Sequence, residues 1–283
     1  MEGAVTALRG WQSSSAFFEE AVVAITGAGA GIGRALALEL SRRGARLALA
    51  DIDAEAVEGT RVACAGPHVP TVSVFDVGDR SQVQAYATGT VEHFGRIDTV
   101  INSAGVLHVG SVADSPLTDF DAVLRINFFG TVQVTKAFLP YLLDQGTRGR
   151  IVTFSSALGL VAAAGHGPYT SAKFAIRGFT EALRADLTGT EIAVVGVYPG
   201  GIRTSIARAA LLAPGIDRHT TVTRFEQHVA RTDPDHAARV VLTGVERGSA
   251  RVLVGADAQL AEITARLAGA RYERLIKLAG RLS

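Results

Sequence analysis

The stretch Thr26-Gly27-Ala28-Gly29-Ala30-Gly31-Ile32-Gly33 decides the fold of this chain. An apolar run at 21–27 leads into it, and a helical pattern at 34–43 follows directly. A strand that ends in a glycine turn and opens into a helix gathers backbone N–H groups at one point, where they bind a phosphate. We predict such a phosphate cradle, with T-G-x-x-x-G-x-G spacing, formed by Gly27, Gly31, Ile32 and Gly33. The plainer alternative is a tight strand–helix turn in a glycine-rich protein.

The rest of the chain repeats this alternation of strand and helix. Apolar runs occur at 21–27, 46–51, 71–77, 98–105, 150–156, 192–199 and 251–256. Helical patterns lie between them at 31–43, 53–63, 79–94, 119–144, 168–188 and 233–247. Near-continuous apolar strands that alternate with helices are typical of a parallel sheet covered on both faces. We predict a single doubly wound, Rossmann-type α/β domain with a central parallel sheet of about seven strands.

No linker divides this pattern, so we predict one catalytic domain over residues 21–256. Residues 1–20, with Trp11 and three consecutive serines at 13–15, are expected to form an N-terminal leader. Within the domain, the segment 200–232 is expected to form a lid over the substrate. Residues 257–283 are expected to form a helical tail.

Composition excludes several classes of function. The chain has 283 residues, and its 28 Lys and Arg against 27 Asp and Glu give a net charge of +1, so we expect no nucleic-acid partner. One cysteine and seven histidines without paired spacing predict neither a disulfide nor a metal site. We find no signal-peptide pattern and no apolar run long enough for a transmembrane segment. A cytoplasmic protein is therefore expected.

Asp51 ends the second predicted strand, 18 residues beyond Gly33. A carboxylate at this place accepts hydrogen bonds from the ribose hydroxyls of adenosine and repels a 2′-phosphate. The sequence therefore favours NAD over NADP. The alternative is that Asp51 is the N-cap of the next helix, a role that Asp53 can fill instead.

Tyr169 and Lys173 are four residues apart in a helical pattern, which places both side chains on one helix face. A free tyrosine has a pKa near 10, and a neighbouring ammonium favours the phenolate. Such a pair is suited to general acid–base catalysis near neutral pH. An ordinary aromatic residue beside a surface lysine is the alternative.

With these motifs, the chain resembles the short-chain dehydrogenase/reductase family over roughly residues 20–256. The other matching motifs are Asp76-Val77, Asn102-Ser103-Ala104-Gly105, Asn127, Ser156, and Pro199-Gly200 followed by Thr204. The resemblance implies that Tyr169 is the general acid/base and that Lys173 lowers its pKa and binds the nicotinamide ribose. It also implies that Ser156, thirteen residues before the tyrosine, binds the substrate oxygen, and that Asn127 positions a proton-relaying water.

The same resemblance implies a set of cofactor contacts and an assembly. Asp76 and Val77 are expected at the adenine. The remaining expected cofactor contacts are Asn102, Ala104, Gly105, Pro199 and Gly200, with Ile202 and Thr204 at the carboxamide. Ser103 departs from the family pattern, which has a second asparagine there. The family also leads us to expect a homo-oligomer, either a dimer or a tetramer.

The substrate is less clearly marked. The loop 157–168 is almost wholly apolar and favours a small hydrophobic secondary alcohol or ketone, for example a steroid-like or long-chain one. Expected lining residues are Leu107, Leu158 and His166, although a loop histidine is as often solvated or a helix cap. The arginines of 200–232 either hold an anionic substrate or form the solvated face of the lid. Other functions left open are an NADPH-dependent 3-oxoacyl-type ketoreductase and a non-catalytic dinucleotide sensor.

Apolar residues recur at helical spacing in the tail, namely Leu260, Ile263, Leu267, Leu275, Ile276 and Leu278. We expect this stripe to pack on the subunit or across an oligomer interface. A helix lying on a membrane surface is the alternative.

Overall fold

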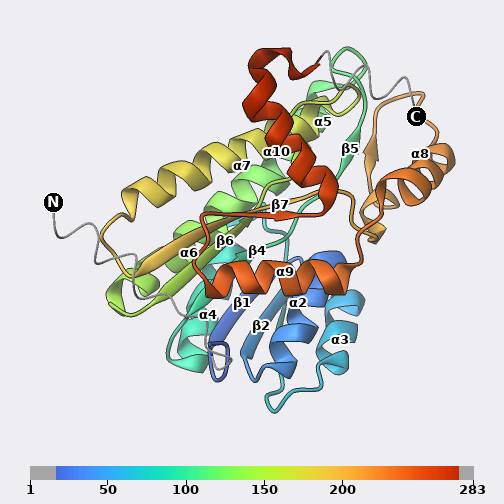
Figure 1. Ribbon diagram of the computed structural model, residues 1–283. Coiled ribbons are helices and arrows are strands. Elements are labelled where there is room, and N and C mark those ends of the chain that lie inside the picture. Colours follow the sequence, from blue (N-terminus) through green and yellow to red (C-terminus); the bar gives the residue numbers. More distant parts are fainter. Residues whose placement is uncertain (1–16, 274–283) are drawn as a thin grey trace, which may run out of the picture.

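Seven parallel strands form the central sheet of the structure, a computed structural model that describes residues 17–273 (Figure 1). The strands are β1 (Val22–Thr26), β2 (Arg46–Asp51), β3 (Thr71–Val74), β4 (Thr99–Asn102), β6 (Gly149–Phe154), β7 (Ile192–Pro199) and β9 (Arg251–Val254). Their order is β3-β2-β1-β4-β6-β7-β9, and every pair is parallel. The predicted doubly wound α/β fold is confirmed. Its order reverses between β1 and β4, which is where such sheets bind ligands.

Helices cover both faces of this sheet (Figure 1). The helices α2 (Gly31–Arg42), α3 (Ala54–Ala63) and α9 (Pro234–Glu246) bury residues such as Leu36, Val57 and Val241 against one face. On the other face lie α4 (Arg80–Phe94), α6 (Gly130–Asp144) and α7 (Gly167–Asp186), with Phe138 and Leu183 in the core. Two apolar layers therefore hold the sheet rigid and fix the ends of its strands in space.

The long helix expected at 119–144 is divided in the structure. A short helix, α5 (Leu117–Val123), continues into a π-helical turn at Leu124–Phe129 before α6 begins. Asn127 lies in this turn and is fully buried. Single π turns inside helices are frequent at functional sites, because the wider turn redirects a side chain.

The end of the expected leader belongs to the folded core. Phe18 is 1% exposed and packs among the residues beneath α2. Phe17 meets the Phe18 ring edge-on and lies under the guanidinium of Arg150. The two aromatic rings bury apolar area near the amino ends of the inner strands β1 and β6, so the folded domain begins before residue 21. Trp11 and the serines at 13–15 lie outside the described residues.

The lid segment 200–232 is partly ordered into small elements. It contains a 3₁₀ turn at Ser205–Ala207, the short strand β8 (Leu211–Leu212), α8 (Arg218–Arg224) and a π turn at Phe225–Val229. β8 pairs in parallel with β5 (His108–Val109), which follows β4. This two-stranded sheet ties the segment to the loop beyond β4.

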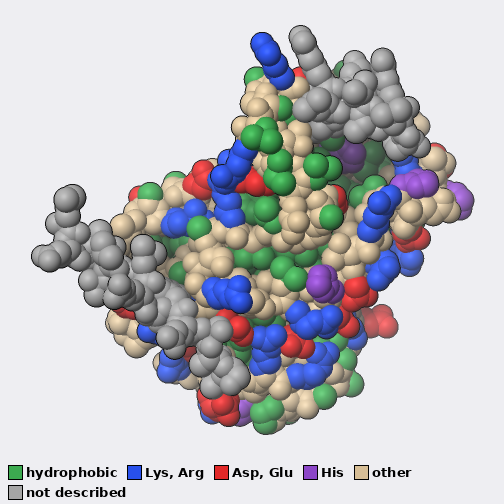
Figure 2. All heavy atoms as spheres, viewed as in Figure 1, with side chains coloured by type: hydrophobic (Ala, Val, Ile, Leu, Met, Phe, Trp, Pro, Cys, Tyr) green, Lys and Arg blue, Asp and Glu red, His purple; other side chains and the backbone are tan. Residues whose placement is uncertain are grey.

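The described part of the tail is α10 (Ala256–Ala268), and it turns its apolar stripe outward. Leu260, Ile263 and Leu267 are 65%, 54% and 84% exposed. Figure 2 shows hydrophobic side chains on the outer surface of this helix. The inward face instead carries Ala258 and the buried, ion-paired Glu262, so these three residues do not pack on the described subunit. Leu275, Ile276 and Leu278 lie outside the described residues. Between residues 17 and 273, no helix has the length and apolarity needed to cross a bilayer.

Candidate active site

A cavity of about 740 Å³ opens at the carboxyl ends of β1, β2, β4, β6 and β7. The glycine turn after β1 forms one end of its wall, and the start of α7 forms the other. A volume of this order is typical of a small-molecule or cofactor site. The predicted phosphate cradle and the predicted tyrosine–lysine pair therefore face one shared space.

The glycine turn is shaped as a cradle. Gly27 and Gly31 have φ values of +70° and +54°, a region that side chains rarely adopt. No side chain caps the first turn of α2, because Ala30 is its N-cap, so its N–H groups are free to bind an anion. Gly27, Gly31 and Ile32 line the cavity, and so does Gly29. These residues fit the phosphates of a dinucleotide.

Gly33 has a different part in the cradle from the one that its motif predicts. It is buried and does not line the cavity. A side-chain carbon at Gly33 would clash with the carbonyl oxygen of Gly27. Gly33 therefore lets α2 approach the turn closely, and it shapes the cradle instead of contacting a ligand.

The carboxylate of Asp51 lies beside the cradle at the end of β2. Its Oδ2 atom accepts a hydrogen bond from the Gly29 N–H at 2.8 Å, and Oδ1 accepts one from the Asp53 N–H at 3.1 Å. Asp53, not Asp51, caps α3, by accepting from the Ala56 N–H at 3.0 Å. Asp51 lines the cavity, and among the described lining residues there is no arginine. An ionised carboxylate has about four acceptor sites, so Asp51 keeps capacity for a further donor.

Only one of the two residues expected at the adenine lines the cavity. Val77 lies in its wall, together with Phe75, a lining residue that the motifs did not indicate. Asp76 does not line the cavity, because its carboxylate is turned away. It accepts from Arg125 Nη1 at 2.7 Å and from the Gly78 N–H at 2.8 Å.

Asn102 also differs from its expected place. It is 2% exposed, and its side-chain amide donates to the Val152 carbonyl at 3.1 Å and to Thr135 Oγ1 at 3.3 Å. It joins β4 to β6 and α6, and it does not line the cavity. The next residues, Ser103, Ala104 and Gly105, do line it. Successive side chains of a strand point to opposite faces of the sheet. The side chain of Asn102 is buried in the protein interior and does not point into the cavity.

The side chain of Asn127 forms hydrogen bonds with the backbone of the loop after Gly105. Its Oδ1 atom accepts from the Val106 N–H at 2.8 Å, and its Nδ2 atom donates to the Val106 carbonyl at 2.9 Å. The side chain is fully buried and does not line the cavity. It therefore clamps this loop, and the structure does not place its amide for the water contact that the resemblance implies.

Ser156, Tyr169 and Lys173 come together at the other end of the cavity. Ser156 follows β6, and it lines the cavity together with Tyr169 and Lys173. Lys173 lies one helical turn after Tyr169 on α7, and its Nζ atom donates to the Phe154 carbonyl at 2.9 Å. The neighbouring Ser155 instead donates its hydroxyl to the Lys173 carbonyl at 2.8 Å. The structure thus separates two serines that the sequence distinguishes only by their offset from the tyrosine.

Burial sets the protonation of this pair. It raises the pKa of Tyr169 to about 12, and the neighbouring Ser156 hydroxyl opposes this rise only in part. Burial also lowers the pKa of Lys173 to about 8. The resemblance implies that Lys173 lowers the tyrosine pKa, and in the structure the loss of water around the buried Tyr169 is the larger effect on that pKa. At neutral pH Tyr169 is therefore a proton donor and Lys173 is still largely charged.

Much of the remaining wall of the cavity is apolar. Leu107 and Leu158 line it, and the lid contributes Phe225 and Val229, which the sequence did not single out. His166 also lines the cavity, and burial lowers its pKa. The other predicted residues in the wall are Pro199, Gly200, Ile202 and Thr204.

Three arginines of the lid form ion pairs or hydrogen bonds outside the cavity. Arg208 pairs with Glu226 at 2.7 Å, and Arg203 pairs with Asp233 at 3.3 Å. Arg218 Nη1 donates to the carbonyl of Arg208 at 2.7 Å. None of the lid arginines lines the cavity, so the reading in which they hold an anionic substrate has no support there.

Comparison with known proteins places this site in a family. A model of the short chain dehydrogenase family matches residues 21–213. The SadH protein of Mycobacterium tuberculosis is 43% identical over 263 residues, covering 92% of this chain and 95% of that protein. The chain belongs to the short-chain dehydrogenase/reductase family. This chain, a short-chain dehydrogenase, is therefore an oxidoreductase.

Other relatives resemble the dehydrogenase over most of its length. Dehydrogenase/reductase SDR family member 7B of mouse is 34% identical, covering 77% of this chain and 70% of that protein. A short-chain dehydrogenase/reductase from Burkholderia phymatum, solved in complex with NAD, superposes with a TM-score of 0.80 at 26% identity, covering 89% of this chain and 94% of that one. Levodione reductase superposes with a TM-score of 0.76 at 26% identity, and the match covers 86% of this chain and 98% of that one. The family match ends at residue 213, so α8, α9, β9 and α10 lie beyond it.

Proposed function

We propose that this dehydrogenase transfers a hydride between NAD(H) and a hydrophobic secondary alcohol or ketone, with Tyr169 as general acid/base. One observation carries the proposal: Tyr169, Ser156 and Lys173 share one cavity with an uncapped glycine cradle. A protein that only senses a dinucleotide has no need of a buried proton donor beside the place where the cofactor would react.

The cofactor assignment rests on the residues around the adenosine end. The N–H groups of the cradle would hold the phosphates, and Asp51 would accept from the ribose hydroxyls. With Asp51 beside the cradle and no arginine in the described wall, a 2′-phosphate would meet negative charge only. The Burkholderia relative was solved with NAD, which agrees with this assignment. When bound, the nicotinamide supplies the hydride acceptor or donor.

Tyr169 moves the proton in either direction. In ketone reduction the neutral phenol donates its proton to the developing alkoxide, and Ser156 stabilises the same oxygen by a hydrogen bond. In alcohol oxidation the phenolate takes the hydroxyl proton. The charge of Lys173, 5.4 Å from the centre of the tyrosine ring, favours that phenolate.

The apolar wall defines the class of substrate. Leu107, Leu158, Phe225 and Val229 line the cavity that also holds Tyr169, and Arg203 and Arg208 of the lid are paired outside it. An uncharged, hydrophobic alcohol or ketone gains binding energy there by burying its apolar surface, whereas a charged substrate would lose its hydration without a partner.

A screen of secondary alcohols of graded hydrophobicity tests the proposal. Each alcohol is incubated with the enzyme and either NAD or NADP, and formation of the reduced cofactor is followed by absorbance, with Tyr169→Phe in parallel. We expect turnover with NAD that increases with apolar size and is lost in the variant. Cofactor binding without turnover by the wild-type enzyme would support a sensor. Tighter binding of NADPH than of NADH, with turnover of carrier-bound 3-oxoacyl groups, would support a ketoreductase.

A further inference from the structure

The first turn of α10 reaches the wall of the cavity, although this helix lies beyond the segment that matches the family. Asp257 is its second residue and is a lining residue of the cavity. It faces the turn Pro199–Gly201, which ends β7. This turn is close to the reacting groups, because the Ser156 hydroxyl lies 3.5 Å from the Pro199 carbonyl oxygen.

The contact between Asp257 and the turn is direct. Its Oδ2 atom accepts a hydrogen bond from the Gly201 N–H at 2.6 Å, and Oδ1 accepts one from the Ala258 N–H at 3.0 Å. The carboxylate also rests on the Cα atom of Gly200, where any side-chain carbon would clash with it. Gly200 and Asp257 are therefore fitted to one another.

The other groups of the turn are held by backbone bonds. The Gly201 carbonyl accepts from the N–H groups of Arg231 at 3.1 Å and Thr232 at 3.0 Å. The Gly200 N–H donates to the Val254 carbonyl at 2.9 Å. Asp257 supplies the partner of the Gly201 N–H, and at 2.6 Å this side-chain bond to the turn is shorter than the one from the Ser156 hydroxyl to the Pro199 carbonyl, at 3.5 Å.

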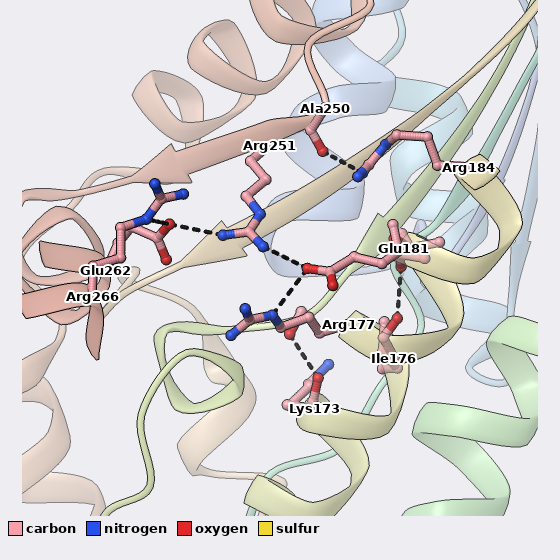
Figure 3. A network of polar contacts seen from close by, with 12 residues as sticks. Lys173, Ile176, Arg177, Glu181, Arg184, Ala250, Arg251, Glu262 and Arg266 are labelled. Carbon is pink, nitrogen blue, oxygen red and sulfur yellow. Dashed lines mark hydrogen bonds and ion pairs between the residues drawn. The ribbon is translucent and has the colours of Figure 1, made fainter. Parts of the chain in front are cut away.

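Helix α10 is in turn fastened to the catalytic helix (Figure 3). Glu262 of α10 accepts from Arg251 Nη1 at 2.7 Å and from Arg266 Nε at 2.6 Å. Arg251 also binds Glu181 of α7 at 2.5 Å. Beyond the C-terminal end of α10, the Tyr272 hydroxyl accepts a hydrogen bond from the Ala162 N–H at 3.1 Å. Ala162 lies on the loop after Ser156. The position of Asp257 is thereby defined relative to Tyr169 and Lys173.

Charge alone does not explain a carboxylate at this place. A dinucleotide carries two negative phosphates, and a carboxylate in the same cavity repels them. A carboxylate is, however, a stronger acceptor for a backbone N–H than a neutral oxygen. We propose that Asp257 is a positioning residue, which holds the turn Pro199–Gly201 in the shape that receives the nicotinamide half of the cofactor. This inference rests on the proposed function.

Three substitutions separate positioning from charge. Asp257→Ala removes both the bond and the charge, Asp257→Asn keeps an acceptor oxygen without the charge, and Gln259→Ala alters an exposed residue of the same helix as a control. NADH affinity is measured by fluorescence titration, and hydrogen exchange of a peptide covering residues 199–203 is measured without ligand. We expect Asp257→Ala to weaken NADH binding about tenfold and to speed exchange, as loss of a charge-assisted hydrogen bond predicts. Asp257→Asn should stay within about threefold of wild type, and Gln259→Ala should match it.

Each other result overturns the inference. Tighter NADH binding by both Asp257 variants means that the carboxylate acts only through charge. Unchanged affinity and exchange mean that it has no part in the site, and weaker binding with unchanged exchange means that it does not act through the turn. Failure of the proposed function is a different result, because it is measured on the wild-type enzyme, as cofactor binding without turnover or as tighter binding of NADPH than of NADH.

A second variant keeps the test valid if Asp257→Ala folds poorly. Gly200→Ala pushes the carboxylate off the turn from the opposite side, so NADH binding should weaken in this variant too. In the double variant Gly200→Ala, Asp257→Ala, the side-chain carbon added at residue 200 meets no carboxylate. The double variant should therefore bind NADH no more weakly than Asp257→Ala alone. Additive losses would mean that the two positions act independently, against the inference.

Discussion

The ammonium of Lys173 lies 5.4 Å from the centre of the Tyr169 ring and donates to the Phe154 carbonyl at 2.9 Å. Both side chains are buried on α7. No carboxylate neutralises the ammonium among its described partners, and burial moves the two pKa values apart, raising that of Tyr169 to about 12 and lowering that of Lys173 to about 8. At neutral pH the site therefore holds a neutral phenol beside a charged ammonium, and the burial of that charge lowers the stability of the protein.

Tyr169→Phe removes the proton donor and should lower turnover by at least about a hundredfold. The phenyl ring still fills the wall, so NADH affinity should stay within about threefold of wild type. Tyr198→Phe is the matched control, because the Tyr198 hydroxyl is buried in β7 without a partner among the described residues. Steady-state kinetics and fluorescence titration check both. Turnover retained by Tyr169→Phe would refute the assignment of Tyr169.

The pH dependence should differ between the two directions. Because burial raises the pKa of Tyr169 to about 12, the phenolate needed for oxidation is scarce at neutral pH and increases with pH. We expect kcat/KM for alcohol oxidation to rise up to about pH 8 and then to flatten, since Lys173 has a pKa of about 8 and loses its charge there. Ketone reduction uses the neutral phenol and should vary little below pH 8. Initial rates in both directions give the profiles, and an oxidation rate that falls with rising pH below 8 would contradict the mechanism.

Lys173→Met should stabilise the protein while abolishing activity. The folded-state pKa of Lys173, about 8, lies below the value of 10.5 for a free lysine, so charging the buried amine costs free energy at neutral pH. We expect the free energy of unfolding at pH 7 to rise by about 1–3 kcal/mol. As the pH rises from 8 to 10.5, the unfolded chain holds a proton that the folded protein lacks, so the wild type gains stability and the difference shrinks.

Denaturant unfolding at pH 7 and above pH 10 measures that difference. Lys136→Met is the matched control, because Lys136 lies exposed on α6 and should change stability little at either pH. A lower stability of Lys173→Met at pH 7 would show that the hydrogen bond to Phe154 outweighs the desolvation of the amine.

Asp51→Ala should narrow the preference for NAD over NADP. The substitution removes both the ribose acceptor and the charge that repels a 2′-phosphate. Asp53→Ala is the control: it loses the N-cap of α3 and about 1 kcal/mol of stability, but the preference should persist. The ratio of kcat/KM values with the two cofactors gives the result. An unchanged ratio in Asp51→Ala would assign the selectivity to another residue.

The sequence by itself determined the parallel sheet, the glycine turn, and the placement of Tyr169 and Lys173 on one helix face. These features are local: apolar runs alternate with helical patterns, the cradle needs glycine at fixed spacing, and Tyr169 and Lys173 share a helix face at four residues' distance. The expected cytoplasmic location and homo-oligomer stay predictions. The exposed stripe of α10 leaves an oligomer interface or a membrane surface as its expected partner.

Only the tertiary structure decided how the site is assembled. Asp76 and Asn102 match family motifs, yet long-range partners, Arg125 and Val152, turn them away from the cavity. Asp257 lies in a segment that looked like a tail, yet it meets Gly201 across 56 positions of sequence. The opposite pKa shifts of Tyr169 and Lys173 likewise come from burial. Hydrogen-bond partners and loss of water depend on which elements pack together, and no local pattern of residues encodes that packing.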